Sequence, residues 1–219
     1  MAKLVVFGAG DIARLAQVYF STDSEHEVVA FAVDAAYRTT DEFQGLPLVA
    51  TEEIARRFPA ASVKMFVAVS YAKMNRLRAE KYAQMKAAGY ELVSYVSSRC
   101  SYLSQHPPGD NCFILEDNTV QPFVRIGSNV TLWSGNHLGH DSTIGDHCFI
   151  SSHVVVSGHV DVGPSCFIGV NATLRNGITI GERTLIGAGA VIMKDTSPGS
   201  VYPGQRSQAI SKTSDQLDL

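Results

Sequence analysis

The strongest constraint in this sequence is an aliphatic residue at every sixth position between Ile114 and Ile192. Every member of the series is Ile, Leu or Val, with no break in register: Ile114, Val120, Ile126, Leu132, Leu138, Ile144, Ile150, Val156, Val162, Ile168, Leu174, Ile180, Ile186 and Ile192. An α-helix has about 3.6 residues per turn, so it does not produce a six-residue rule. A short strand followed by a sharp corner does, and we interpret the series as a repeat. It predicts triangular coils of three strands, with the aliphatic side chains inward and the coils stacked about 4.8 Å apart.

Two further positions of each hexad follow rules of their own. Four residues after the aliphatic position the side chain is mostly small: Val130, Asn136, Ser142, Cys148, Val154, Val160, Cys166, Ala172, Ile178, Thr184, Ala190 and Thr196. Glycine often follows the aliphatic residue directly, as at Gly145, Gly163, Gly169, Gly181 and Gly187. We expect these glycines to supply the backbone freedom that the corner needs. Three of the four cysteines, Cys112, Cys148 and Cys166, fall at the small position and form no C-x-x-C pair. We therefore expect buried thiols and a reducing, cytoplasmic setting.

The N-terminal segment has the pattern of a strand, a turn, a helix and a second strand. An apolar run at 3–10 ends in Gly8, Ala9 and Gly10, and a second apolar run ends in Asp34. With Ala13, the glycines fit G-x-G-x-x-A, the turn at which a Rossmann-like unit receives a phosphate against a helix N-terminus. Asp34 follows at the distance expected of an acid that contacts a ribose or a base. A tight turn without a ligand is the alternative.

The remaining N-terminal elements predict a small α/β domain. The expected elements are a helix at 51–58 with a Thr-x-Glu capping pattern, a buried strand at 63–70, a helix at 72–88 and a strand at 91–97. This unit is too short for a complete dinucleotide-binding fold. We predict a Rossmann-like domain at 1–97, a parallel β-helical domain at 98–210, in which 98–112 is a polar join, and a polar tail at 211–219.

Charge and hydropathy exclude two classes of partner. The net charge of −3 leaves no basic footprint for nucleic acid. No apolar run approaches the roughly 20 residues that span a membrane, and the first ten residues show no signal-peptide pattern.

The densest departure from the repeat is the segment 133–142, WSGNHLGHDS. A narrow coil has no room inside for a large polar group, so we expect its chemistry on the outside. His140 beside Asp141 suits a general base whose tautomer is held by a carboxylate. An unreactive surface pair is the alternative. His137 either lines the same cleft or caps the edge of the coil.

Metal and coenzyme sites are less constrained by the sequence. His147, His153 and His159 are six apart and should point to different sides of the triangle, so a zinc site would need ligands from two subunits. We keep zinc as an alternative and expect no metal. In the last coils Ala172, Ala188 and other small residues leave room for an extended ligand such as coenzyme A. Lys194 would meet its phosphate or be solvated.

The chain resembles the bacterial sugar acyltransferases of the PglD/NeuD type over about residues 3–206. The resemblance rests on the domain order, on the glycine turn with Asp34, and on the HDSTIG motif that begins at His140. It implies a left-handed β-helix of hexapeptide repeats, a homotrimer with active sites between subunits, acetyl-CoA as donor, and a nucleotide-linked amino sugar as acceptor. His140 would be the catalytic base and Asp141 the acid that raises its basicity.

The resemblance also implies the binding residues. Gly8, Ala9 and Gly10 would hold the pyrophosphate, Asp34 and Ala35 the base, and Ser70 the same ligand. Gly158, Val170 and Ala188 would contact the coenzyme through backbone groups. Phe149 would lie at the same site, where the family has a second histidine. This departure leaves the identity of the sugar open.

The leading hypothesis is therefore an acetyl-CoA-dependent N-acetyltransferase acting on a nucleotide-linked amino sugar. The alternatives are an O-acetyltransferase for a sialic-acid-like sugar, a non-catalytic nucleotide-sugar scaffold, and an NAD-dependent enzyme built on the glycine turn. The short α/β segment and the lack of a hydride-transfer pocket argue against the last.

Overall fold

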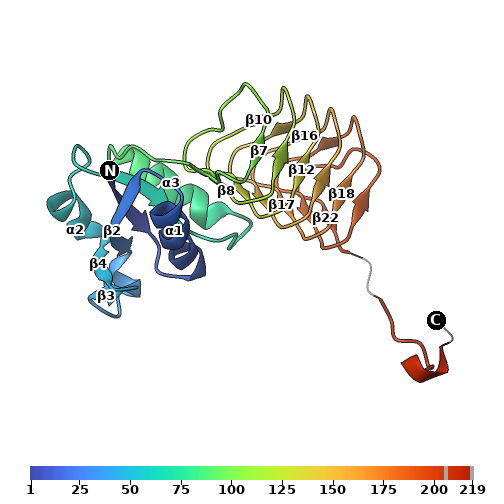
Figure 1. Ribbon diagram of the computed structural model, residues 1–219, viewed down its shortest axis with the longest axis horizontal. Coiled ribbons are helices and arrows are strands. Elements are labelled where there is room, and N and C mark those ends of the chain that lie inside the picture. The colour runs from blue at the N-terminus through green and yellow to red at the C-terminus, as the bar shows by residue number, and fades with distance from the viewer. Residues whose placement is uncertain (205–206, 218–219) are drawn as a thin grey trace.

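The computed structural model describes residues 1–204 and 207–217 and shows two domains in sequence order. The N-terminal domain carries the long helices, and it packs against the first coils of a β-helix that extends away from it (Figure 1). Within the described residues, no helix combines the length and the apolar character needed to cross a membrane.

The N-terminal domain is an α/β sheet in the strand order β3-β4-β2-β1-β5, parallel except for the β3–β4 hairpin. Its elements are β1 (Ala2–Phe7), α1 (Asp11–Thr22), β2 (His26–Val33), the 3-10 helix η1 (Ala35–Tyr37), β3 (Glu42–Phe43), β4 (Leu46–Ala50), α2 (Thr51–Arg57), β5 (Lys64–Val67) and α3 (Arg76–Ala87). This confirms the expected α/β fold. The hairpin of β3 and β4 was not predicted.

Two local expectations in this domain were wrong. The Thr51 side chain does not cap α2, because Ala50 is the N-cap residue and the Thr51 hydroxyl donates instead to the Val33 carbonyl at 3.0 Å. The segment 91–97 is not one strand of the α/β sheet: only Leu92 bridges to Met65 of β5. Its last residues form β6 (Tyr95–Val96), which pairs with β8 (Phe113–Ile114) of the β-helix. The Val96 side chain packs against the β-helix core, whereas Tyr95 belongs to the core of the N-terminal domain.

The β-helix has three parallel sheets, which we call the seven-, six- and four-stranded faces. The seven-stranded face is β6, β8 (Phe113–Ile114), β11 (Thr131–Leu132), β14 (Phe149–Ile150), β17 (Phe167–Ile168), β20 (Leu185–Ile186) and β22 (Val201–Tyr202). The six-stranded face is β7 (Ser101–Tyr102), β9 (Thr119–Val120), β12 (His137–Leu138), β15 (Val155–Val156), β18 (Thr173–Leu174) and β21 (Val191–Ile192). The four-stranded face is β10 (Arg125–Ile126), β13 (Thr143–Ile144), β16 (Asp161–Val162) and β19 (Thr179–Ile180).

The register confirms the predicted coil of eighteen residues. Thr131 pairs with Phe149 and Phe149 with Phe167, and the other faces keep the same step. All fourteen aliphatic residues of the series point inward and are at most 5% exposed. The β-helix extends beyond the predicted hexads at both ends: β6 and β7 precede them, and β22 follows with a shorter step, pairing Val201 with Leu185. Residues 207–217 are exposed and include the 3-10 helix η2 (Ser214–Gln216).

The glycines that follow the aliphatic positions have a different role from the one expected. None of these five glycines has a left-handed backbone; that conformation falls two residues later, as at His147, Ser165 and Asn171. A Cβ built on Gly145 would lie 2.7 Å from the backbone nitrogen of Pro164 in the next coil. These glycines therefore permit the close approach of successive coils.

The two domains meet on the seven-stranded face. Phe20, Phe66, Tyr95 and Phe113 pack ring against ring across the junction. The Asn111 amide bonds both backbone groups of Val67 at the end of β5. The junction is therefore a continuation of the core of the N-terminal domain, which fixes the glycine turn relative to the β-helix.

Candidate active site

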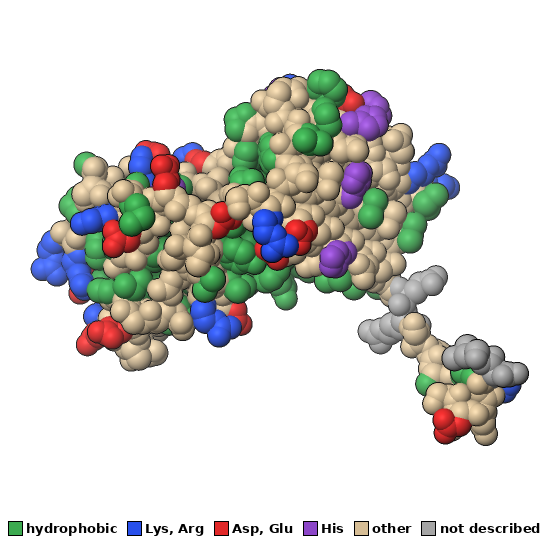
Figure 2. Space-filling view, viewed as in Figure 1, with side chains coloured by type: hydrophobic (Ala, Val, Ile, Leu, Met, Phe, Trp, Pro, Cys, Tyr) green, Lys and Arg blue, Asp and Glu red, His purple; other side chains and the backbone are tan. Residues whose placement is uncertain are grey.

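Two corners of the triangular coil carry the predicted site residues. The tryptophan corner joins the seven- and six-stranded faces at 133–136 and recurs at 151–154, 169–172 and 187–190. The histidine corner joins the six- and four-stranded faces at 139–142 and recurs at 157–160 and 175–178. In Figure 2 the visible histidine side chains gather on the β-helix rather than on the N-terminal domain.

His140 and Asp141 form a hydrogen-bonded pair at the histidine corner. Adjacent residues in a strand point to opposite faces. The left-handed backbone of Asp141, with φ of 57°, breaks that alternation and brings its carboxylate to the imidazole. His140 Nδ1 and Asp141 Oδ2 are 2.9 Å apart, and the side chains are 52% and 43% exposed. Asp141 therefore holds the proton on Nδ1 and leaves Nε2 as an accessible acceptor.

Gly158 provides the space for the His140 ring one coil later. A Cβ at this position would lie 2.8 Å from Nε2 and 3.0 Å from Cε1 of His140. Within the described residues, the Gly158 backbone N–H donates no hydrogen bond, whereas the His159 N–H bonds the His140 carbonyl at 2.9 Å. A free donor therefore lies beside the accepting nitrogen of the imidazole.

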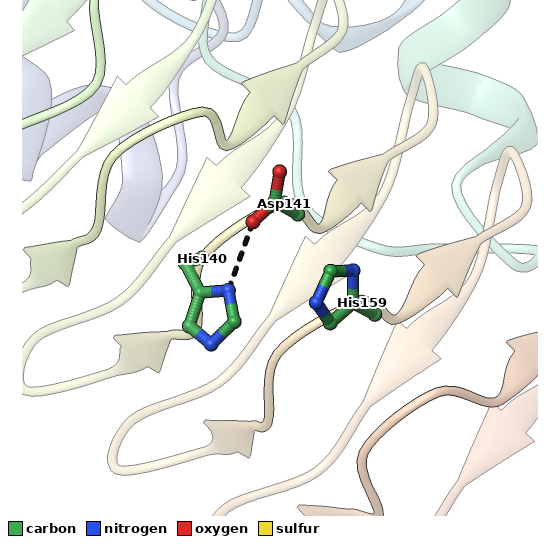
Figure 3. A group of neighbouring side chains, drawn as sticks. All are labelled: His140, Asp141 and His159. Atoms are coloured by element: carbon green, nitrogen blue, oxygen red, sulfur yellow. Dashed lines mark hydrogen bonds and ion pairs between the residues drawn. The ribbon is translucent and has the colours of Figure 1, made fainter.

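His159 joins this pair, which the sequence analysis missed. It lies eighteen residues after Asp141 at the same corner, and its ring meets that of His140 edge-on with centroids 4.9 Å apart (Figure 3). One ligand atom from each of His140, Asp141 and His159 lies within 4.8 Å of the others. His147, His153 and His159 lie at three different corners, as expected. The cluster instead joins His159 to a pair one coil earlier, because a step of eighteen residues stacks side chains within one chain.

The predicted coenzyme residues are divided between the two corners. Val170 and Ala188 are exposed at the tryptophan corner, one coil apart. Gly158 is at the histidine corner, and Lys194 is exposed in the same column two coils further on. His137 lies on β12, half-buried on the outer side of the six-stranded face between the corners. Within one chain the structure does not bring these residues together.

Phe149 is not at the histidine corner. It lies on the seven-stranded face, opposite that corner, and is 3% exposed. Its ring stacks on Phe167 at 5.8 Å, contacts Tyr71 at 5.0 Å, and lies below the Arg78 guanidinium. Phe149 is therefore part of the junction between the two domains, and its role in coenzyme binding stays a prediction.

Two cavities share the glycine turn of the N-terminal domain. One, of about 380 Å³, is lined by Phe7, Gly8, Ala9, Gly10, Val33, Asp34, Tyr37, Val69, Leu77 and Lys81. The other, of about 520 Å³, is lined by Gly8, Ala9, Gly10, Asp11, Ile12, Ala68, Val69, Ser70, Tyr71 and Trp133. Ala35 begins η1 and lines neither of them. The predicted turn, Asp34 and Ser70 are thus brought together.

The glycine turn and Asp34 are both held rigidly. Gly8 has φ of 134°, and a Cβ there would lie 2.6 Å from the Ala68 carbonyl oxygen, so only glycine fits. Gly10 is the N-cap residue of α1 and has open space around it. The Lys81 ammonium donates to the Asp34 carboxylate at 2.7 Å. Sequence analysis missed Lys81 because helical periodicity alone does not show which lysine faces a strand end.

Comparisons with known proteins agree with this architecture. The family model described as bacterial transferase hexapeptide (six repeats) matches residues 124–158 and 159–194. Among curated proteins, none matches the sequence significantly. Among solved structures, the acetyltransferase domain of PglB from Neisseria gonorrhoeae aligns with a TM-score of 0.82 and 24% identity, covering 92% of this chain and 96% of that one.

Two other solved structures align over the same extent. PerB from Caulobacter crescentus, in complex with CoA and GDP-perosamine, has a TM-score of 0.78 and 22% identity, covering 92% of this chain and 93% of its own. WeeI from Acinetobacter baumannii has a TM-score of 0.78 and 18% identity, covering 92% and 96%. This chain therefore has the two-domain fold of these proteins, and its residues 124–194 are hexapeptide repeats of the bacterial transferase type.

Proposed function

We propose that this protein is an acetyl-CoA-dependent N-acetyltransferase that acts on the amino group of a nucleotide-linked amino sugar. The observation that carries the proposal is the His140–Asp141 pair, held at an exposed corner with Nε2 of His140 beside Gly158. The fold shared with the PglB acetyltransferase domain, and with PerB in complex with CoA and GDP-perosamine, supports it. No metal takes part in this reaction.

The imidazole supplies the base that acetyl transfer to an amine needs. The attacking amine loses a proton as its nitrogen bonds the thioester carbonyl carbon, and Nε2 of His140 accepts that proton. Asp141 keeps the other nitrogen protonated and stabilises the imidazolium that forms. The free N–H of Gly158 would stabilise the oxyanion of the tetrahedral intermediate, which then expels the coenzyme thiolate. Because amine and thioester are held side by side, no acetylated protein is formed.

The two N-terminal cavities suit the nucleotide part of the acceptor. Gly8, Ala9 and Gly10 lie between the cavities, where the N-terminus of α1 favours a pyrophosphate. Asp34 and Lys81 offer an acceptor and a donor at one end, and Ser70 and Trp133 line the other, which opens toward the β-helix.

The division of residues between two corners supports an active site shared between subunits of a homotrimer. The cavity with Ser70 reaches the tryptophan corner through Trp133, whereas His140 lies across the six-stranded face at the histidine corner. We therefore place the nucleotide-sugar on one subunit and the base on its neighbour. The four free cysteines support a cytoplasmic location.

The experiment is thiol release from acetyl-CoA against a panel of nucleotide-linked amino sugars, with a free sialic-acid-like sugar to detect O-acetylation. We expect one amino sugar to give turnover, and His140→Asn to lower kcat by about 10²–10⁴. A thermal-shift panel with acetyl-CoA, NAD and nucleotide-sugars tests binding separately. If His140→Asn turned over an acceptor of the panel at the wild-type rate, the assignment of His140 as the base would be overturned. Nucleotide-sugar binding without turnover of any acceptor would favour the scaffold alternative.

A further inference from the structure

We propose that the histidine corner is also an inhibitory site for a divalent transition-metal ion of the zinc class, with His140, Asp141 and His159 as ligands. The cluster offers two imidazole nitrogens and one carboxylate oxygen within 4.8 Å of one another. Binding of the ion is independent of the proposed acetyl transfer. Only its inhibitory effect depends on that function.

The repeat brings the three ligands to adjacent coils of one chain. Asp141 and His159 occupy equivalent corner positions, with φ of 57° and 56°, so their side chains leave the corner in the same direction. The His159 N–H donates to the His140 carbonyl at 2.9 Å and joins the histidine corners of two successive coils. The backbone that carries the ligands is therefore fixed before any ion binds.

The remaining adjustment is small. Ligand atoms about 2.0–2.1 Å from a tetrahedral zinc ion lie roughly 3.4 Å from each other. The three atoms already lie within 4.8 Å of one another, and all three residues are exposed. Figure 3 shows the three side chains on neighbouring coils. Rotation of the exposed side chains about their own bonds closes the difference. The fourth position of the ion faces solvent.

The donor set selects the class of ion. Imidazole nitrogens suit Zn²⁺, Ni²⁺ and Cu²⁺, whereas Mg²⁺ and Ca²⁺ prefer oxygen ligands. We therefore expect Zn²⁺ to bind and Mg²⁺ not to compete with it. Among the described residues, this is the one group of three His, Cys, Asp or Glu side chains close enough together to hold a metal ion.

Bound zinc would remove the base in either mode of ligation. If the ion binds Nε2 of His140, it occupies the lone pair that would accept the proton of the amine. If it binds Nδ1, the neutral ring carries its proton on Nε2, which then donates and cannot accept. In both cases the Asp141 carboxylate is withdrawn from the imidazole.

The binding test uses the full-length, untagged protein and needs no acetyl-CoA. Zn²⁺ is titrated by calorimetry and by competition with a chromophoric chelator, for wild type, His159→Asn and His153→Asn. Asparagine tolerates the left-handed backbone that both histidines adopt, so neither substitution strains its corner. His153 is the matched control because it lies at the tryptophan corner, outside the cluster.

We expect wild type and His153→Asn to bind one zinc ion per chain, and His159→Asn to bind it at least about tenfold more weakly. An excess of Mg²⁺ should leave all three affinities unchanged. Equal zinc affinity in His159→Asn and wild type would overturn the site. So would the absence of zinc binding to the wild-type protein.

The inhibition test compares each protein with its own metal-free turnover. Zn²⁺ should inhibit wild type and His153→Asn at the concentration that fills the site, and a chelator should restore the rate. His159→Asn should need at least about tenfold more Zn²⁺. Full turnover with the site filled would overturn the inhibitory role. If no acceptor is acetylated, the proposed function fails, while the binding titration still decides the metal site.

Discussion

The position of the His140 ring, on which its proposed role as a base rests, depends on a glycine as much as on its carboxylate partner. Asp141 fixes the tautomer through one ring nitrogen, and Gly158 leaves the space in which the other nitrogen lies. The Gly158 backbone is not in the left-handed region, so glycine is needed here for space rather than for conformation. A small side chain would therefore move the imidazole without straining the corner.

Gly158→Ala should reduce activity while leaving the fold intact. The added Cβ would meet Nε2 and Cε1 of His140, the far end of an exposed side chain that can swing aside. A displacement of about 1 Å at a reacting group costs on the order of 10²-fold in rate, so we expect kcat to fall by about that factor. The thermal midpoint should stay within about 2–4 °C of wild type, as it does for a change below 1 kcal/mol.

Ser157→Ala is the control for this prediction, because it changes the residue next to Gly158 without adding an atom at position 158. It should keep both its activity and its thermal midpoint. Wild-type turnover in Gly158→Ala would show that the position of the ring over Gly158 is not needed.

At the scale of elements, one buried arginine joins α3 to the β-helix. Arg78 is 2% exposed, and its guanidinium donates to the Thr131 hydroxyl and to the carbonyls of His147 and Cys148. Burial lowers the pKa of Arg78 to about 10, so the side chain still carries its charge at neutral pH. The neutral oxygens and the Phe149 ring stabilise that charge. Because α3 also carries Lys81, this anchor positions one wall of the cavity that Asp34 and Lys81 line.

Arg78→Met should destabilise the protein by about 2–4 kcal/mol. Each hydrogen bond from a charged group contributes about 1.5–3 kcal/mol, and its loss leaves buried oxygens unpaired, which the packing of methionine only partly offsets. Urea unfolding followed by circular dichroism measures the change. Arg76→Met on the same helix is the matched control: its exposed pair with Glu80 contributes about 0.5 kcal/mol or less. Equal urea midpoints for Arg78→Met and wild type would contradict the anchoring role.

The sequence predicts some elements far better than others, for physical reasons. The hexads are predictable because each coil buries its aliphatic residue in the same way, so the pattern is local and repeated. The pairing of residues 91–97 is not predictable in this way, because tertiary packing decides which of the two sheets Tyr95 and Val96 join. His140 and Asp141 stand out as departures from a regular pattern. His159 was missed because the sequence repeats every six residues, whereas side chains become neighbours in space only after a full coil of eighteen residues.

At the scale of the whole molecule, the six-stranded face separates the two cavities at the glycine turn from the His140–Asp141 pair. Its outward positions hold no Asp, Glu, Lys or Arg: Ser101, Thr119, His137, Val155, Thr173 and Val191. The four-stranded face, by contrast, presents Arg125 and Asp161. Protein interfaces are depleted of charge at their centre, so the six-stranded face suits contact between subunits. Such contact would bring the tryptophan corner of one subunit to the histidine corner of the next.

Two inactive variants should therefore restore each other when mixed. His140→Asn removes the base and keeps the nucleotide cavity. Gly10→Asp keeps the base and places a negative charge where the pyrophosphate would bind. Aspartate is a favoured N-cap residue, and a Cβ on Gly10 meets nothing within 4 Å, so α1 should fold normally. Each variant alone should be a trimer by light scattering and nearly inactive.

In trimers assembled at random from equal amounts, a site needs an intact cavity on one subunit and an intact base on the next. Each condition is met in half of the cases, so about a quarter of the sites are intact and about a quarter of the wild-type activity should return. If cavity and base belonged to the same chain, no hybrid would contain an intact site, and co-refolded mixtures would be as inactive as the separate variants. The recovered fraction therefore distinguishes a site between subunits from a site within one subunit, whichever nucleotide-sugar is the acceptor.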